Sequence, residues 1–153
     1  MTTINDKQLD AYVAGKTELK DLIGLSSTDL EQLKGRAQFF LDGSHKERAL
    51  IMLEMLEELD RTDSAPSLLA IELLLEQGNS DAAEEKIEAL LARDPSDTDA
   101  LVAKAQLLVG IGQMVPAAEL LERVVAKDPD AGSDAGKRAV ALAAHAHDLF
   151  ENG

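Results

Sequence analysis

Cysteine and tryptophan are absent from this sequence of 153 residues, and its aromatic side chains are limited to one tyrosine and three phenylalanines. Without cysteine, the chain forms no disulfide, carries no thiolate nucleophile and offers no cysteine-based zinc site. It also lacks an apolar run near the roughly 20 residues that cross a bilayer, and no charged-then-apolar segment stands at its start. We therefore expect a cytoplasmic protein that does not span a membrane.

Basic residues are also few. Lysine and arginine number 15 against 29 aspartates and glutamates, so the formal net charge is -14. Nucleic-acid phosphates and anionic lipid surfaces repel a chain this acidic, and we expect neither nucleic acid nor membrane as a partner. Alternating runs of β-branched residues are missing as well, whereas Ala, Leu, Glu, Lys and Gln are abundant, which favours an all-α fold.

A period of about 34 residues runs through the middle of the chain. A shift by this length superimposes seven identical pairs: Gly78 with Gly112, Ala83 with Ala117, Glu85 with Glu119, Glu88 with Glu122, Ala92 with Ala126, Asp94 with Asp128, and Pro95 with Pro129. A more diverged copy precedes these two and contains Ala49, Leu56 and Asp60. Apolar residues recur at three- and four-residue steps on both sides of each glycine, which predicts a helical hairpin in each copy.

These hairpins resemble the tetratricopeptide repeat, a unit of about 34 residues with a small residue at position 8, alanine at position 20 and proline at position 32. The three copies carry Ala37, Ile71 and Ala105 at position 8, Ala49, Ala83 and Ala117 at position 20, and Arg61, Pro95 and Pro129 at position 32. The resemblance implies an all-α fold, a superhelical stack of three hairpins with an N-terminal helical region and a C-terminal capping helix. The expected boundaries are 1–28 for the N-terminal region, 29–62, 63–96 and 97–130 for the repeats, and 131–153 for the capping helix. Ser27 or Thr28 is expected to cap the helix that opens the first repeat, with Glu31 completing a capping box after Thr28.

Stacked hairpins of this kind offer a concave face, lined by the first helix of each unit. Carried over from the repeat, positions 5, 9 and 12 predict a peptide-binding groove formed by Lys34, Gln38, Leu41, Leu68, Glu72, Leu75, Val102, Gln106 and Val109. Its apolar middle and polar fringe suit an extended peptide with alternate apolar anchors. For Leu41, Leu75 and Val109, packing between helices fits the spacing equally well.

The segment Thr17–Leu50, TELKDLIGLSSTDLEQLKGRAQFFLDGSHKERAL, resembles the start of the first repeat in the type III secretion chaperones that hold translocator proteins. That resemblance implies a holding chaperone for a protein client, an extended segment of a secreted or membrane-active protein, before its export. It also implies a homodimer, formed through Leu9, Tyr12, Val13, Leu19, Leu22 and Ile23. As an alternative, the same residues fold back on the first repeat as a cap. A second hypothesis for the function is a general repeat scaffold that joins proteins in a larger assembly.

The sequence offers little for catalysis or for metal binding. His145 and His147 are two positions apart, so on one helix they point about 200° away from each other and cannot share a metal ion. Paired carboxylates such as Glu84 and Glu85 fall on expected solvent-facing helix surfaces, and no G-x-S-x-G motif is present. We therefore expect a protein that is not an enzyme, with no catalytic residues, no cofactor and no metal.

Overall fold

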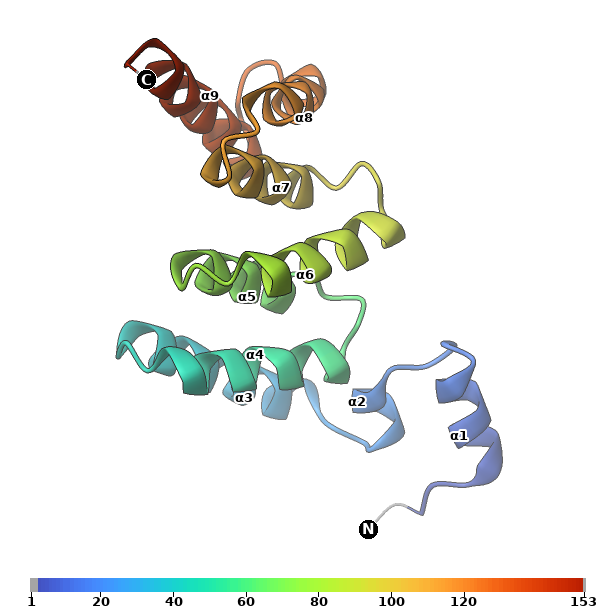
Figure 1. The fold of residues 1–153 in the computed structure, drawn as a ribbon. Coiled ribbons are helices and arrows are strands. Elements are labelled where there is room, and N and C mark those ends of the chain that lie inside the picture. Colours follow the sequence, from blue (N-terminus) through green and yellow to red (C-terminus); the bar gives the residue numbers. More distant parts are fainter. Residues whose placement is uncertain (1–2, 153) are drawn as a thin grey trace. The chain divides into compact units, whose positions relative to one another are not determined.

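The computed structural model describes residues 3–152, and within them it contains nine α-helices and no strand (Figure 1). The helices are α1 (Asp6–Val13), α2 (Leu19–Leu22), α3 (Ser27–Asp42), α4 (Lys46–Leu59), α5 (Ala65–Glu76), α6 (Ser80–Arg93), α7 (Thr98–Gly110), α8 (Met114–Lys127) and α9 (Asp134–Asn152). The three predicted hairpins correspond to α3–α4, α5–α6 and α7–α8. The all-α fold class, with helices before and after the hairpins, is confirmed.

The turn inside each hairpin depends on one residue in the left-handed backbone region. Gly78 has φ +72° and Gly112 has φ +80°, a conformation that glycine adopts without steric cost. The equivalent residue of the first hairpin is Ser44, with φ +58°. Because a side chain raises the energy of this conformation, the first turn is strained where the other two are relaxed.

The first residue of α3 lies slightly earlier than the sequence pattern suggested. Ser26 is the N-cap: its hydroxyl accepts a hydrogen bond from the Asp29 backbone N–H at 3.1 Å, and the Asp29 carboxylate accepts one from the Ser26 N–H at 3.2 Å. The predicted cap at Ser27 or Thr28 is therefore wrong by one or two residues. The capping-box chemistry is the expected one, with aspartate in place of glutamate.

An aspartate follows the second helix of every hairpin, at 34-residue intervals: Asp60, Asp94 and Asp128. Its carboxylate accepts a hydrogen bond from a backbone N–H in the following loop and so shapes the connection to the next helix. These bonds run from Thr62 to Asp60 at 3.0 Å, from Ser96 to Asp94 at 2.9 Å, and from Ser133 to Asp128 at 2.9 Å.

The chain divides into two compact units, Met1–Leu73 and Leu74–Gly153, each with its own core. In the first unit, α3 packs against α4, and α2 also contacts α4. The buried residues of this core are Leu30, Ala37, Leu53, Leu56, Leu59 and Ala70. Ala37 is the small residue at position 8, and its burial lets the helices approach closely.

In the second unit, α7 packs against α6 and α8, and α9 packs against both α7 and α8. The buried residues of the core are Leu101, Val102, Ala105, Val109, Ala117, Leu121, Val124, Ala135 and Ala139. Ala139 follows Ala105 by one repeat length, and both are fully buried. α9 thus occupies the place of a first helix relative to α7 and α8. No helix within residues 3–152 is both long and apolar enough to cross a membrane.

Candidate protein-binding site

In the first unit, the predicted groove residues lie on α3 and α5 with different exposures. Gln38 and Glu72 are exposed, whereas Lys34, Leu41 and Leu68 are half-buried. Leu41 and Leu68 can therefore contact the neighbouring helices and still present part of their surface. The prediction that these five residues bind a peptide stays a prediction.

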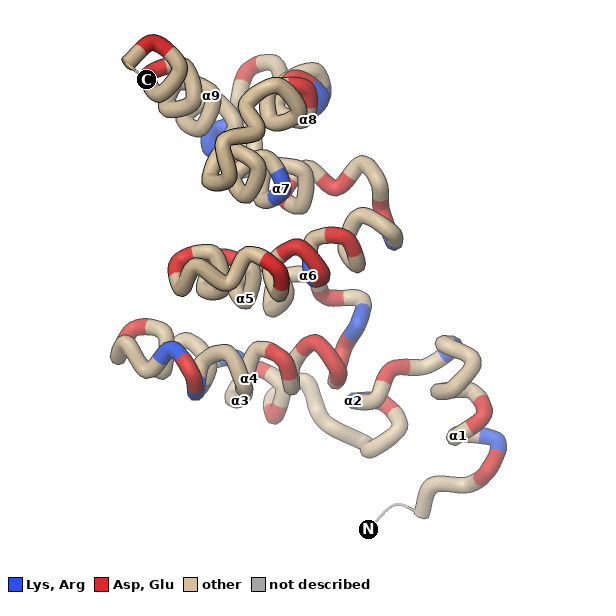
Figure 2. Tube along the Cα trace, viewed as in Figure 1, with Lys and Arg blue, Asp and Glu red and all other residues tan. Residues whose placement is uncertain are grey.

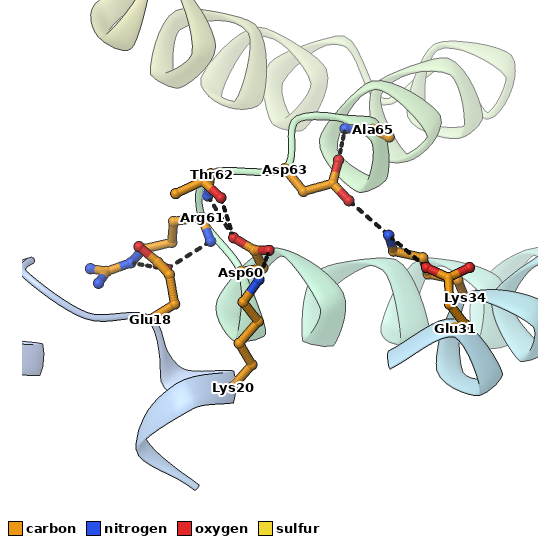
Figure 3. Close-up of polar contacts among 9 residues, drawn as sticks. All are labelled: Glu18, Lys20, Glu31, Lys34, Asp60, Arg61, Thr62, Asp63 and Ala65. Atoms are coloured by element: carbon orange, nitrogen blue, oxygen red, sulfur yellow. Dashed lines mark hydrogen bonds and ion pairs between the residues drawn. The ribbon is translucent and has the colours of Figure 1, made fainter. Parts of the chain in front are cut away.

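Lys34 is held in place by two carboxylates. Its Nζ lies 3.1 Å from Asp63 and 3.4 Å from Glu31 (Figure 3). The hydrogen bond to Asp63 is the main reason why the pKa of Lys34 is raised above its ordinary value. A cavity of about 150 Å³ brings Lys34 and Gln38 together with Leu69, a half-exposed side chain of α5. This small cavity is suited to one side chain of a ligand rather than to a whole segment.

In the second unit, two of the predicted groove residues belong to the core. Val102 is 1% exposed and Val109 is 8% exposed. The prediction that Val102 presents its side chain to a ligand is wrong, because α7 is covered by α6, α8 and α9 and buries side chains on several faces. Val109, for which two orientations fitted the spacing, is also part of this core.

A larger cavity, of about 460 Å³, lies in the second unit. It brings together three predicted groove residues: Leu75 from α5, Gln106 from α7, and the small exposed part of Val109. The remaining lining residues are Gly78, Ser80, Leu107, Gly110, Leu142 and His145. The wall is thus apolar at Leu75 and Leu142 and polar at Gln106 and His145. Such a wall can contact apolar side chains of an extended segment and hydrogen-bond to its backbone.

Sequence reasoning missed the contribution of α9 to this cavity. Leu142 and His145 were not assigned to the site, because this helix was predicted only to cover the end of the stack. The signal was present in the 34-residue step from Ala105 to Ala139, which makes α9 equivalent to a first helix. The same interval of 34 residues separates Leu108 from Leu142.

The six residues predicted for a dimer interface differ in their burial. Leu22 is 7% exposed, and Leu19 packs against the core of the first unit. These two leucines behave as the alternative prediction of a cap describes. Leu9, Val13 and Ile23 are instead exposed, by 48%, 78% and 46%. Tyr12 is half-buried, with the guanidinium of Arg61 5.1 Å above its ring.

A polar network joins α2 to the end of α4 (Figure 3). Lys20 forms an ion pair with Asp60. Glu18 accepts hydrogen bonds from the backbone N–H of Arg61 at 2.9 Å and from its Nε at 3.2 Å. The other two repeats have proline at the position of Arg61, and proline has no backbone N–H to donate. The hydrogen bond from the Arg61 N–H to Glu18, which holds the segment before α2, can therefore form only where proline is replaced.

Asp60 is the most perturbed carboxyl group of this network. Burial alone would raise its pKa, and this is the largest single effect on the group. The hydrogen bonds from Lys20 and Thr62 together outweigh burial and lower the pKa from 3.8 to about 2. Asp60 therefore stays ionised at neutral pH although its side chain is only 9% exposed.

Acidic residues are frequent along α6 (Figure 2). Glu84 and Glu85 are exposed, as predicted for a solvated face, and Glu88 forms an ion pair with Lys104 of α7. No three His, Asp or Glu side chains among the described residues gather where they could hold a metal ion.

Comparison with known proteins shows which sequence family and which folds the chain resembles. Residues 74–143 match the sequence model of a family described as tetratricopeptide repeat. This match covers somewhat less than half of the chain, and it agrees with the tetratricopeptide resemblance that the 34-residue period predicted. No curated protein matches its sequence.

Solved structures define the resemblance further. The type III secretion translocator chaperone SycD of Yersinia enterocolitica is 21% identical, with a TM-score of 0.71 over 90% of this chain and 98% of SycD. A type III secretion complex from Aeromonas hydrophila contains a chain that is 18% identical, with a TM-score of 0.72 over 95% of this chain and 94% of that one. PcrH of Pseudomonas aeruginosa, in complex with the chaperone binding region of PopB, is 21% identical, with a TM-score of 0.64 over 82% of this chain and 98% of PcrH. The predicted resemblance to translocator chaperones is confirmed at the level of the fold.

Proposed function

We propose that this protein is a cytoplasmic, non-enzymatic chaperone that binds an extended segment of a secreted or membrane-active client before export by a type III secretion system. The observation that carries the proposal is the 460 Å³ cavity in the second unit, in a chain with the fold of translocator chaperones. PcrH has that fold and has been solved with a segment of PopB.

The chemistry of the cavity supports a peptide ligand. Leu75 and Leu142 supply apolar contact area, while Gln106 and His145 supply hydrogen-bonding groups. An extended segment needs both, because its side chains alternate between the wall and solvent and its backbone groups need partners. The net charge of -14 keeps such a complex soluble while apolar client surface is covered.

The proposal is tested by co-expression with a protein encoded beside this one. We expect the client to be soluble and to co-purify with the chaperone, and to precipitate when expressed alone. A client that is equally soluble without this protein would contradict the proposal.

A matched pair of variants locates the binding site. Gln106→Arg places a longer cation in the cavity at an exposed position and should weaken client binding about tenfold, since it blocks a central contact. Glu85→Gln changes the net charge by the same amount on the exposed face of α6 and should leave binding unchanged. Val102→Glu is unsuitable for this purpose because it would place a charge in the core.

We also propose that the exposed apolar residues of the N-terminal segment, Leu9, Val13 and Ile23, form a homodimer interface, while Leu19 and Leu22 belong to a cap. Sedimentation of the protein and of Val13→Glu measures this directly. A dimer that dissociates in the variant supports the interface, and a wild-type monomer at high concentration contradicts it. The proposal includes the expected boundaries: an N-terminal region of residues 1–28, three repeats that end at residue 130, and a capping helix that begins at residue 131.

One observation favours a second function, a scaffold that joins proteins in a larger assembly. None of the nine predicted groove residues is aromatic, which reduces the apolar area that a groove can offer to a client. A scaffold would bind two proteins at once and would leave their solubility unchanged. Client solubility in the co-expression experiment therefore separates the two functions.

A further inference from the structure

A second and larger apolar groove lies between α8 and α9, apart from the cavity that Gln106 lines. Its volume is about 610 Å³. The lining residues are Met114, Ala118, Leu121, Glu122, Val125, Ala126, Ala143, Ala146, His147 and Phe150, and none of them lines the other cavity. A site here is therefore independent of the client-binding site proposed above.

The shape of this groove suits an α-helix. Its lining includes four alanines, which allow the backbone of a third helix to approach closely, and larger side chains such as Met114 and Val125. α8 has 14 residues and is therefore about 21 Å long, which matches about four turns of a bound helix. Helices that bind in this way place apolar residues at positions i, i+3, i+4 and i+7.

The groove also contains apolar surface that the fold leaves uncovered. Phe150 is 78% exposed and Val125 is 39% exposed. Large apolar side chains that converge on a groove are typical of interaction sites. A bound helix would remove both side chains from water.

The charges along the groove determine the kind of helix. Glu122 lines it, and the Glu151 carboxylate lies 3.4 Å from Nε2 of His147, which also lines it. The cations of α8 face elsewhere: Arg123 donates to the Pro95 carbonyl at 3.0 Å, and Lys127 donates to the Ser96 carbonyl at 2.7 Å. No lysine or arginine is among the lining residues.

From this geometry we infer that the groove between α8 and α9 binds a basic amphipathic helix of another protein. Apolar residues on one face of that helix fill the groove, and its flanking lysines or arginines lie near Glu122 and Glu151. A second copy of this chain fits less well, because acidic residues outnumber basic ones by 29 to 15 and its helices offer few cations to Glu122 and Glu151.

Two synthetic helical peptides of about 18 residues, a little longer than α8, test the inference. Both carry leucine at i, i+3, i+4 and i+7, with lysine at the remaining positions of one and glutamate in the other. Fluorescence anisotropy should show micromolar binding of the lysine peptide and at least about tenfold weaker binding of the glutamate peptide. Equal binding of the two peptides would overturn the charge assignment.

Matched variants separate docking in the groove from general attraction to an acidic protein. Phe150→Glu removes an apolar wall, whereas its neighbour Leu149→Glu adds the same charge at a residue that does not line the groove. General attraction predicts tighter binding of the lysine peptide to both variants. Docking predicts about tenfold weaker binding to Phe150→Glu alone.

Three outcomes would overturn the inference. The first is an unchanged affinity of the lysine peptide for Phe150→Glu, with native helix content shown by circular dichroism. The second is an equal loss of affinity in Leu149→Glu. The third is a dimer of the free protein that dissociates in Phe150→Glu, which would assign the groove to a second copy. Gln106→Arg should leave peptide binding here intact, so failure at this groove and failure of the proposed chaperone site are distinguishable.

Discussion

Replacement of Asp60 by asparagine tests the polar network that joins α2 to α4. The substitution keeps the size of the side chain and its capacity to accept a hydrogen bond from Thr62, but it removes the charge that pairs with Lys20. The Asp60 side chain is 9% exposed, so solvent screens this interaction only weakly. We expect a clear loss of stability at neutral pH.

The pKa of Asp60 gives the size of the effect. The shift from 3.8 to about 2 is a difference of about 1.8, which at 1.36 kcal/mol for each pH unit corresponds to about 2 kcal/mol. Because the folded-state pKa lies below the unfolded-state value, this stabilisation is fully present above about pH 4. It is lost as the pH falls through about 2.

Urea unfolding followed by far-ultraviolet circular dichroism measures this difference. Asp60→Asn should be less stable than the wild type by about 2 kcal/mol at pH 7, and the two proteins should converge as the pH falls from about 4 to about 2. Asp94→Asn, at the equivalent position of the next repeat, is the control. Asp94 is exposed and bonds to Ser96, so its loss should matter less. Equal stability of Asp60→Asn and the wild type at pH 7, or a gap that persists at pH 2, would refute the reasoning.

The remaining predictions concern turns and helix packing, each measured by the same unfolding experiment. Ser44→Gly should stabilise by about 0.5–1 kcal/mol, because it relieves φ +58°, and Gly112→Ala should destabilise by about 1 kcal/mol at φ +80°. If neither variant changed the free energy of unfolding, the explanation by backbone strain would be contradicted. Ala83→Leu should lower the free energy of unfolding by about 1–3 kcal/mol because Ala83 is fully buried, whereas Ala92→Leu should lower it little because Ala92 is exposed. Gly136→Ala should loosen α9, since its Cβ would lie 2.9 Å from Cγ of Asp128, and unchanged hydrogen exchange in α9 would contradict this.

The hairpins were predictable because their signals are local and repeated. Glycine at the turns, alanine at position 20 and aspartate after each second helix recur at fixed spacing, and each has one favoured structural role. The N-cap of α3 was missed by one or two residues for a related reason. Ser26, Ser27 and Thr28 are consecutive good caps, and both Ser26 and Thr28 have an acidic residue three positions later.

The site was less predictable, because exposure depends on neighbours that a repeat pattern does not specify. Val102 occupies a position that faces the groove by analogy, yet α9 packs against α7 and the valine is buried. His145 lines the cavity for the same reason, because it lies on α9, the helix that packs against α7. The exposed fractions of Leu9 and Leu22 likewise differ although both were assigned to one interface, because only Leu22 lies on the short helix that contacts α4.

Arg61, which stands where the other repeats have proline, also provides a way to observe the N-terminal segment in solution. Its backbone amide hydrogen is held by Glu18, so it exchanges with solvent deuterium only when that carboxylate moves away. The rate of exchange at this one amide therefore reports how often the segment detaches from the first repeat. The prolines at 95 and 129 carry no such hydrogen, so among these equivalent positions only the first repeat contains this internal reporter.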